Sequence, residues 1–426
     1  MKKTNLIKIM ALVLSMIVVV SALVACKPQT GGPASSTPPA NEPKKLTIGG
    51  ADISEYTLVY GKSEPTAKQM ALEIVDAVSK AAGVTLTAKD DSVNYESGKE
   101  ILVGHTNRTT ENGVAKNFYT ATAELAKDDF IMYTEGDFFF VGGVKGSNVA
   151  ITAAVKKLIA DINATESGAL TYTSATPVKA ENVSTYKIVT YNDGDPATTK
   201  VNNVVNFLLE LEPDIVGMQE VQKQQATGQY PILMKNYGFV YYDHKDPEQG
   251  ESGAPILYRK DKFILIDSGI QWLSDTPDVE GSVYPESDYI RSYVYAILED
   301  RQTGQEIVVV NTHIDYKEAA NTKQVQKLLE LTEKFQDKMV IYTADWNMRT
   351  SWEGFRLMNE AGYTDGGTAY GKVIPDSKNY IDFVFVDTKK VTVNDYQFYT
   401  NHKFSAGRPE AASDHNPVMV EIAIFH

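Results

Sequence analysis

Cysteine is almost absent from this 426-residue sequence, which contains a single one, Cys26. An intrachain disulfide is therefore excluded, and so is a zinc site built on several thiolates. The chain also lacks the HExxH motif of zinc proteases and the Gly-x-Ser-x-Gly motif of serine hydrolases, and its segment GGVKGS does not have the Lys-Ser/Thr spacing of a P-loop. These absences argue against three common kinds of hydrolytic site.

The N-terminal region contains one long apolar run, from Ile9 to Val24. This run is short for a membrane span. Three lysines within the first eight residues precede it, which is the pattern of a secretory signal over residues 1–26. The run ends in LVAC, which resembles a bacterial lipobox, and this resemblance implies that Cys26 becomes the lipidated first residue of the mature protein. An ordinary secretion signal with an incidental cysteine is the alternative.

Residues 27–45 are rich in Pro, Gly, Ser and Thr and contain almost nothing apolar. Such a composition cannot bury a core and predicts a flexible linker. With the lipobox, it predicts that the folded part stands at the cell surface, lipid-anchored to the outer face of the bacterial membrane.

The sequence as a whole has the composition of a soluble globular protein, with 43% hydrophobic and 23% charged residues, and the remainder is long enough for two domains. The net charge of −14 is unevenly distributed. Residues from 181 onward contain 23 Lys and Arg against 37 Asp and Glu, which accounts for the whole of it. We therefore expect a domain boundary near residue 180, between residues 46–180 and 181–426.

The first of these segments is expected to form a small α/β domain. Apolar residues follow a helical spacing over 67–82, EILVG has the pattern of a buried strand, and DDFIMYTEGDFFFVGG predicts a hairpin. The segment resembles the small domain that precedes the catalytic barrel in some secreted glycoside hydrolases, which implies an accessory role. His105 and Arg108 are expected to serve structure or the surface rather than a site.

The second segment repeats one pattern: apolar runs of strand length end, or open, with polar residues that can hold a metal ion or a phosphate. These residues are Asn192, Gln219, Glu220, Asn311, His313, Asp315, Asp345, Asn347, Asp382, Asp414 and His415. One polar strand end is commonly a cap or a turn former, but six such runs in one domain predict a shared polar pocket. Asp382 lies inside an apolar strand and needs a partner, for which His415 is the obvious candidate.

Carboxylate and amide oxygens are hard ligands that suit Mg²⁺ or Mn²⁺. The set of Glu220, Asp345 and Asp414 with nearby asparagines therefore fits metal-assisted attack of water on phosphorus. The order of the motifs is Asn192, QE, NTH, ADWN, ID and SDH over about residues 186–424. In this order they resemble the endonuclease/exonuclease/phosphatase, or DNase I-like, superfamily.

The resemblance implies an α/β fold, a four-layered sandwich of two mixed sheets with flanking helices. It also implies roles for the site residues. Glu220, Asp414 and Asn192 would belong to the metal site, and Asn192, Asn347 and Arg291 would bind the substrate phosphate. His313, Asp345, Asp382 and His415 would be catalytic, with His415 held by Asp382. Which of Asp345 and His415 is the base stays open.

Two positions call for comment. Where the superfamily usually has glycine in Gly-Asp-x-Asn, this chain has Ala344, which a strand end tolerates unless the backbone needs a positive φ. Arg291 heads a strand, and either a phosphate contact or a surface ion pair would explain it.

The sequence thus predicts a monomeric, surface-anchored, metal-dependent phosphoesterase acting on phosphodiesters or phosphomonoesters. Nucleic acid is a possible partner that the negative charge does not favour. The alternatives are an extracellular DNase I-like nuclease and a non-catalytic ligand-binding lipoprotein on the same scaffold. A carbohydrate-active enzyme would need paired carboxylates in the first domain, and no convincing pair is present there.

Overall fold

The computed structural model describes residues 44–194, 198–228, 230–242, 244–246, 250–400 and 413–426. The predicted signal, most of the linker and Cys26 lie outside the described residues. Residues 43–426 form one unit. No helix within the described ranges is both long enough and apolar enough to cross a membrane.

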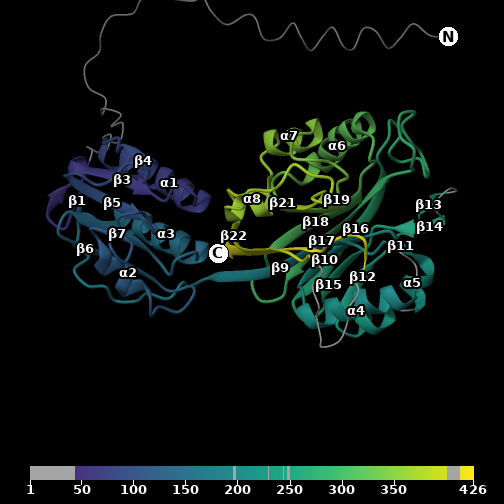
Figure 1. Cartoon of the computed structure of the whole chain (residues 1–426), viewed down its shortest axis with the longest axis horizontal. Helices are drawn as coiled ribbons and strands as arrows, with labels where there is room; N and C mark the ends of the chain where they lie inside the picture. Colours follow the sequence, from purple (N-terminus) through teal and green to yellow (C-terminus); the bar gives the residue numbers. More distant parts are fainter. Residues whose placement is uncertain (1–43, 195–197, 229, 243, 247–249, 401–412) are drawn as a thin grey trace, which may run out of the picture. The chain divides into compact units, whose positions relative to one another are not determined.

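The N-terminal part is built around a five-stranded sheet of order β4-β3-β5-β7-β6 (Figure 1). Strands β3, β4, β5 and β7 are parallel, and β6 pairs antiparallel with β7. The strands are β3 (Tyr56–Tyr60), β4 (Ala88–Asp90), β5 (Lys99–Val103), β6 (Phe130–Glu135) and β7 (Phe138–Gly143). The predicted hairpin is confirmed, since β6 and β7 are joined by two residues, of which Gly136 has a φ of 58°.

Helices cover both faces of this sheet because successive strand residues point to opposite sides. Leu58 and Ile101 pack in one apolar cluster with α1 (Pro65–Ala82) and α3 (Asn148–Ala164). The next residue of each strand packs on the other face, with Phe118 of α2 (Lys116–Thr122). A small sheet of order β2-β1-β8 completes this part, with β1 (Thr47–Ile48), β2 (Ala51–Asp52), the 3₁₀ turn η1 (Ile53–Glu55) and β8 (Ala169–Leu170).

The C-terminal part contains two six-stranded mixed sheets. Sheet I has the order β12-β15-β10-β9-β23-β22, and sheet II has the order β16-β17-β18-β19-β21-β20. Each contains one parallel pair, β9 with β10 in sheet I and β18 with β19 in sheet II.

Sheet I consists of β9 (Val183–Asn192), β10 (Ile215–Gln219), β12 (Tyr237–Val240), β15 (Ile256–Arg259), β22 (Thr392–Phe398) and β23 (Val418–Phe425). Sheet II consists of β16 (Phe263–Trp272), β17 (Ser292–Asp300), β18 (Glu306–His313), β19 (Met339–Asp345), β20 (Thr364–Asp365) and β21 (Asp382–Val386). The helices are α4 (Thr198–Leu211), α5 (Lys223–Gly228), η2 (Tyr230–Lys235), α6 (Glu318–Thr332), η3 (Glu333–Phe335), α7 (Glu353–Glu360) and α8 (Gly366–Tyr370). A third, short sheet consists of β11 (Val221–Gln222), β13 (His244–Asp246) and β14 (Gly250–Gly253).

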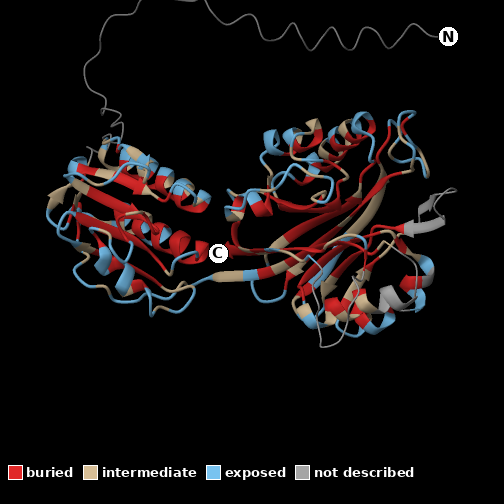
Figure 2. Ribbon diagram, viewed as in Figure 1, coloured by how far each residue is buried: buried red, intermediate tan, exposed pale blue. Residues whose placement is uncertain are grey.

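Three apolar clusters define four layers. The middle cluster joins the facing sides of sheets I and II, as with Ile188 and Val309. A second cluster packs the outer side of sheet II against α6 and α7, and a third packs the outer side of sheet I against α4 and η2. Figure 2 shows the sheets buried between helices whose outer faces are exposed. The predicted four-layered α/β sandwich is confirmed.

The facing sides of the two sheets are not apolar throughout. The Gln219 amide donates to Asn311 (2.7 Å) and Thr190 (3.1 Å), and Thr343 donates to Asn311 (3.1 Å), all fully buried. A Cβ at Gly217 would lie 2.0 Å from Thr343 Oγ1, so glycine is required for the sheets to approach this closely. We call these five residues the polar seam.

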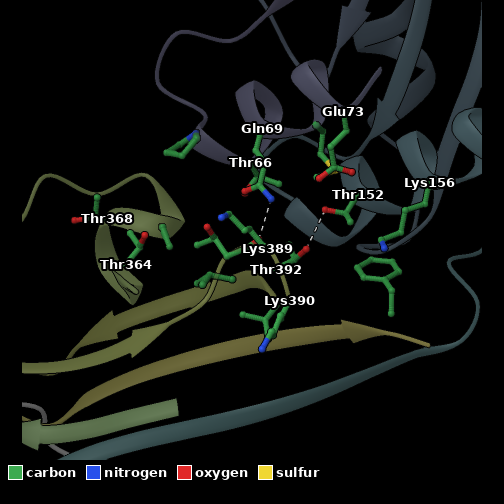
Figure 3. A pocket seen from close by; sticks show the side chains of 17 residues that line it. Thr66, Gln69, Glu73, Thr152, Lys156, Thr364, Thr368, Lys389, Lys390 and Thr392 are labelled. Carbon is green, nitrogen blue, oxygen red and sulfur yellow. Dashed lines mark hydrogen bonds between the residues drawn. The ribbon is translucent and has the colours of Figure 1, made fainter. Parts of the chain in front are cut away.

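The N-terminal helices contact the C-terminal part through a few polar groups. Gln69 donates to the Thr388 carbonyl (2.9 Å), Asn148 donates to the Val393 carbonyl (2.6 Å), and the Thr152 and Thr392 hydroxyls lie 3.1 Å apart. A cavity of about 210 Å³ lies among these elements (Figure 3). Phe425 of β23 also packs against the apolar cluster of α1 and α3, and none of the predicted site residues lines the cavity.

Candidate active site

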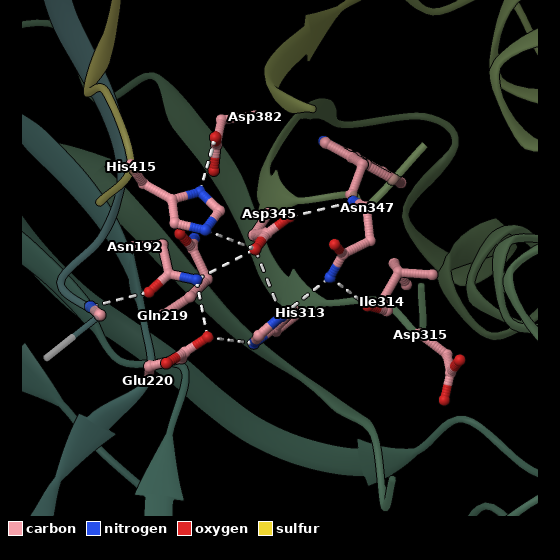
Figure 4. Close-up of polar contacts among 12 residues, drawn as sticks. Asn192, Gln219, Glu220, His313, Ile314, Asp315, Asp345, Asn347, Asp382 and His415 are labelled. Carbon is pink, nitrogen blue, oxygen red and sulfur yellow. Dashed lines mark hydrogen bonds and ion pairs between the residues drawn. The ribbon is translucent and has the colours of Figure 1, made fainter. Parts of the chain in front are cut away.

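Strand register brings the predicted site residues together at one edge of the sandwich (Figure 4). In sheet I, Asn192 pairs in register with Gln219, and Gln219 directly precedes Glu220 in the chain. In sheet II, His313 is the partner of Asp345, and Asp345 is in turn the partner of Asp382. Because these strand ends lie side by side, Asn192 and Asp382, 190 positions apart in the chain, belong to one cluster of polar residues around Asp345.

Asn192 connects the carboxylates of the two sheets. Its Nδ2 donates to Glu220 Oε1 (3.0 Å) and to Asp345 Oδ2 (3.0 Å), and its Oδ1 accepts the Gly194 backbone N–H (2.9 Å). Asn192 and Asp345 are buried, whereas Glu220 is half-buried. In this arrangement the asparagine amide bonds to both carboxylates and holds them near each other.

His313 lies on the other side of Asp345. Its Nε2 is 3.3 Å from Asp345 Oδ2 and 3.0 Å from Asn347 Nδ2, and its Nδ1 is 3.9 Å from Glu220 Oε1. The imidazole therefore touches a carboxylate from each sheet.

His415 approaches from the loop before β23. Its Nδ1 lies 2.9 Å from Asp382 Oδ2, and its Nε2 lies 3.7 Å from Asp345 Oδ2. The predicted pairing of Asp382 with His415 is therefore present in the structure. Although burial alone would lower it, the pKa of His415 is raised because Asp382, Asp345 and Asp414 stabilise the imidazolium. Burial and the charge of Asp345 raise the pKa of Asp382.

Asp345 is at the centre of these contacts and is almost fully buried, with 1% of its surface exposed. Burial alone would raise its pKa, but the imidazoles of His313 and His415 and the hydrogen bond from Asn192 hold the pKa of Asp345 well below its ordinary value. An acceptor with several donors around it in a buried site is a suitable group for orienting a water molecule.

Asn347 is fixed by three hydrogen bonds. Its backbone N–H donates to Asp345 Oδ1 (2.9 Å), and its side-chain amide contacts the Ile314 carbonyl (3.0 Å) and His313. Its φ is +47°, and Glu220 has a φ of +60°. A left-handed backbone at a non-glycine residue costs about 1 kcal/mol or more and is typical of functional sites. Sequence patterns do not reveal this strain. Ala344, by contrast, has no positive φ, so the absence of glycine there costs nothing.

Arg291 is 5% exposed, and this excludes a surface ion pair. Its Nη2 lies 3.3 Å from His313 Nε2, and its guanidinium lies over the Tyr289 ring, 4.9 Å from the centroid. The structure thus places Arg291 beside the site, where a guanidinium can contact an anionic substrate.

Asp414 is exposed and lies at the rim, close to Gly194, where an added Cβ would come within 2.4 Å of Asp414 Oδ1. Its neighbour Ser413 donates to the Asn192 carbonyl (2.8 Å). Asp414 therefore contributes charge to the pocket from a position next to Asn192.

The residues fit a divalent cation. Glu220, His313 and Asp345 offer ligand atoms that all lie within 4.8 Å of one another, and so do Asp345, Asp382 and His415. The metal site predicted from the sequence is Glu220 with Asp414 and Asn192, and the geometry also groups Glu220 with Asp345 and His313. Carboxylate oxygens favour Mg²⁺ or Mn²⁺, and one imidazole nitrogen is compatible with Mn²⁺.

Three residues that the strand-end pattern grouped with the site have structural roles in the fold described above. Gln219 and Asn311 belong to the polar seam. Asp315 accepts the Asp288 (3.0 Å) and Lys317 (2.8 Å) backbone N–H groups and therefore fixes a turn.

The sequence pattern also missed Asp193, a buried carboxylate that interacts electrostatically with Glu220. Its carboxylate accepts the Tyr230 hydroxyl, and burial raises its pKa to about 7. Only its position directly after Asn192 could have indicated it.

A model of the Endonuclease/Exonuclease/phosphatase family matches residues 184–415, which is more than half of the chain. Among curated relatives, the uncharacterized protein L388 of Acanthamoeba polyphaga mimivirus is 28% identical over 152 residues, 34% of this chain and 56% of that protein. The CCR4-Not complex 3'-5'-exoribonuclease subunit Ccr4 of Aspergillus clavatus is 28% identical over 171 residues, 36% of this chain and 25% of its own length. The chain thus spans about half or less of these relatives.

Among solved structures, an endonuclease/exonuclease/phosphatase family protein from Bacteroides thetaiotaomicron matches with a TM-score of 0.50 at 21% identity. The match covers 57% of this chain and 98% of that one. At this identity the likeness shows the fold of the C-terminal part.

Proposed function

The chain belongs to the Endonuclease/Exonuclease/phosphatase family, and we propose that it is a divalent-metal-dependent hydrolase of small phosphoesters, anchored at the cell surface. The observation that supports the activity is that two carboxylates, Glu220 and Asp345, and two imidazoles, His313 and His415, lie in one cluster in which Asp345 is near both imidazoles. Motif loss would indicate a non-catalytic scaffold, and no member of the set is missing.

Glu220 and Asp345 are the residues that would hold the cation, with Mg²⁺ or Mn²⁺ as the expected metal. When bound, the cation would polarise a phosphoryl oxygen and offset its negative charge. Asn192 keeps the two carboxylates in place through its bonds to both, so it acts as a positioning residue as well as a neighbour of the metal site.

Asp345 would orient the attacking water by accepting a hydrogen bond from it, and the water would lose its proton to solvent as the new P–O bond forms and the bond to the leaving oxygen breaks. His415 presents Nε2 on the same side, because Asp382 occupies Nδ1. That arrangement lets the imidazole stabilise charge on the phosphoryl oxygens in the transition state, as a carboxylate-oriented histidine does elsewhere. Arg291 Nη2 lies 3.3 Å from His313 Nε2, so both side chains can bind the phosphate, and His313 can also donate a proton to the leaving oxygen.

Small substrates are favoured by charge. The part of the chain from residue 181 carries the whole net charge of −14, and affinity for nucleic acid depends on Lys and Arg neutralising phosphates. The similarity to an exoribonuclease subunit keeps an extracellular nuclease as the second candidate.

The surface anchor rests on the lipobox-like LVAC and on the linker that follows it. Replacing Cys26 by serine should release the protein from bacterial membranes into the medium. Unchanged retention of Cys26→Ser in the membrane fraction would refute lipidation at this residue.

The activity is tested with a panel of phosphoesters containing duplex DNA, RNA, bis-p-nitrophenyl phosphate, sphingomyelin and inositol phosphates. Each is assayed with Mg²⁺, with Mn²⁺ and with chelator, and metal binding is measured separately by calorimetry. We expect turnover of at least one small phosphoester that chelation abolishes. A protein that binds neither metal and hydrolyses nothing in the panel would be the non-catalytic alternative.

A further inference from the structure

The N-terminal sheet contains a reversal of strand order at β3 and β5. From β3 the chain passes through α1 to β4, which lies on one side of β3. Strand β5 lies on the other side of β3, and from β5 the chain continues to β6 and β7, farther out on that side. In open sheets of this kind, the connections diverge at such a point and leave a crevice beyond the carboxyl ends of the two strands. Ligands bind preferentially in that crevice.

A cavity of about 390 Å³ lies there. Its walls come from the segments that follow all four parallel strands and from α2. Chemically it is lined by carboxyl, hydroxyl, imidazole, amide and ammonium groups, with one aromatic ring. The residues that matter for the argument are Glu64, Asp91, His105, Thr110, Tyr119 and Lys145. None of them lies in the segment that matches the family, residues 184–415.

Glu64 has a niche made for its carboxyl group. A Cβ at Gly61 would lie 3.2 Å from Glu64 Cδ, and a Cβ at Gly104, where φ is +67°, would lie 3.0 Å from Glu64 Oε2. Both glycines therefore leave room that the carboxyl group occupies. Although Glu64 directly precedes α1, its side chain does not cap the helix. Its Oε2 is buried and has no hydrogen-bond partner within the described part of the chain.

This arrangement costs stability. Burial raises the pKa of Glu64 to about 7, with Lys145 lowering it and Asp91 raising it. A buried carboxylate without a donor is unfavourable, and cores of natural proteins rarely keep one without a functional reason. A ligand that donates a hydrogen bond into the niche would supply what the protein does not.

The neighbouring polar groups are already used within the protein. Asp91 accepts the Lys62 and Asn107 backbone N–H groups at 2.8 Å each. The His105 Nε2 lies 3.0 Å from the Gly143 carbonyl, and burial lowers the pKa of His105. Asp91 and His105 therefore form the walls of the cavity, whereas Glu64 Oε2 accepts no hydrogen bond from the described residues.

We propose that this cavity binds a neutral, polyhydroxylated ligand, namely a sugar unit of hexose type. A hydroxyl group both donates and accepts, so one ligand can donate to Glu64 and accept from the Lys145 ammonium group. An anionic ligand would meet Glu64, Asp91 and Glu111, which outnumber Lys145 among the lining residues. A cationic ligand would be attracted by these carboxylates, but an ammonium group has no acceptor for the hydrogen bond that Lys145 can donate. The volume accommodates a small ligand, and the Tyr119 ring, 38% exposed, offers an apolar surface at the wall.

The test is saturation-transfer NMR on the full chain with a panel of neutral hexoses and disaccharides, with a sugar phosphate and a primary alkylamine for comparison. We expect transfer to at least one neutral sugar. Glu64→Gln keeps the shape and removes the charged acceptor, so it should weaken binding at least about tenfold. Thr110→Trp places a large side chain on an exposed wall residue and should abolish binding.

Glu96→Gln is the matched control, because it makes the same chemical change at an exposed glutamate outside the cavity, and it should bind like the wild type. Circular dichroism confirms that each variant is folded. Three results would overturn the proposal: no neutral sugar binds, the amine or the sugar phosphate binds better than every neutral sugar, or binding is the same in Glu64→Gln and Thr110→Trp as in the wild type. Phosphoester hydrolysis should be unchanged in all three variants, so this result does not depend on the proposed activity.

Discussion

Asp382 and His415 meet between the two sheets of the sandwich, with 2.9 Å between Oδ2 and Nδ1. Asp382 is the first residue of β21 in sheet II, and His415 precedes β23 in sheet I. The pair therefore orients an imidazole of one sheet by a carboxylate of the other. The pocket exists as a site only when both sheets are folded and aligned.

Asp382→Asn should lower kcat by about 10²- to 10⁴-fold while leaving the fold intact, because the amide no longer fixes the orientation and charge of His415. The measurement is steady-state kinetics on a small phosphoester with circular dichroism alongside. Asp365→Asn is the control, since Asp365 is equally buried but only caps α8. It should change stability and leave kcat near that of the wild type. A wild-type rate in Asp382→Asn would show that the pairing does not serve the reaction.

Glu220→Gln and Asp345→Asn should each remove most of the turnover and weaken binding of Mn²⁺, because each replaces a carboxylate ligand by a weaker neutral one. Calorimetric titration with Mn²⁺ separates loss of metal from loss of chemistry. Glu299→Gln, on β17 and away from the pocket, should behave as the wild type in both assays. Activity that survives both substitutions and chelation would refute the metal-dependent mechanism.

Substitutions of Asn347 can separate the cost of its left-handed backbone from the loss of its side-chain amide. Asn347→Ala and Asn347→Gly both remove the amide beside His313, so both should lower kcat. Because φ is +47° at this position, the glycine variant should be more stable than the alanine variant by about 1 kcal/mol. Urea unfolding of the two variants measures the difference. Equal stabilities would mean that the backbone relaxes here without cost.

The raised pKa of Glu64 predicts that the stability of the protein depends on pH. Its pKa is raised from 4.5 to about 7 in the folded state, so the folded protein binds the proton more tightly than the unfolded chain. The contribution of Glu64 to stability should therefore fall as pH rises from about 4.5 to 7 and stay constant above. Glu64→Gln should leave the melting temperature unchanged at pH 4.5 and raise it at pH 8, relative to the wild type. A lower melting temperature for the variant at pH 8 would show that the charged carboxylate is stabilised in the fold.

The last prediction concerns substrate size. At moderate salt, kcat/KM on a small phosphodiester should exceed that on plasmid DNA, because the acidic C-terminal part repels a long polyanion and a cation offsets this only at the phosphate being cleaved. The comparison is repeated at low and high salt. A large preference for DNA would make the protein a nuclease.

The sequence predicts much of this fold because the strands are apolar and their ends are marked by polar residues. Asn192, Glu220, His313, Asp345 and His415 all reach one pocket for this reason. Gln219 and Asn311 followed the same pattern, yet they join the sheets in the interior. Side-chain alternation indicates the face of a strand but not the depth along it, so the pattern cannot separate a residue in the site from one two positions deeper.

Other features depend on information that local sequence does not hold. The left-handed conformations of Glu220 and Asn347 are imposed by the surrounding structure, since both residue types ordinarily prefer negative φ. The niche of Glu64 depends on which strands are neighbours in the sheet, and Gly61 and Gly104 are 43 positions apart in the chain. Such a niche becomes visible only when the strand order is known.

Gly217 and its neighbours in the polar seam have a consequence for how the two sheets are aligned. Apolar surfaces can slide past each other with little change in energy, whereas hydrogen bonds are directional and break together when one sheet shifts by a residue, about 3.3 Å. The bond from Gln219 to Asn311 and the bonds from the Asn311 amide to the Met218 and Pro255 carbonyls cross between the sheets and therefore favour one lateral register. Asp345 belongs to one sheet, and Glu220 follows a strand of the other. A variant with an apolar seam could therefore remain as stable as the wild type and still lose activity, because the Asp345 and Glu220 carboxylates would no longer be aligned with each other.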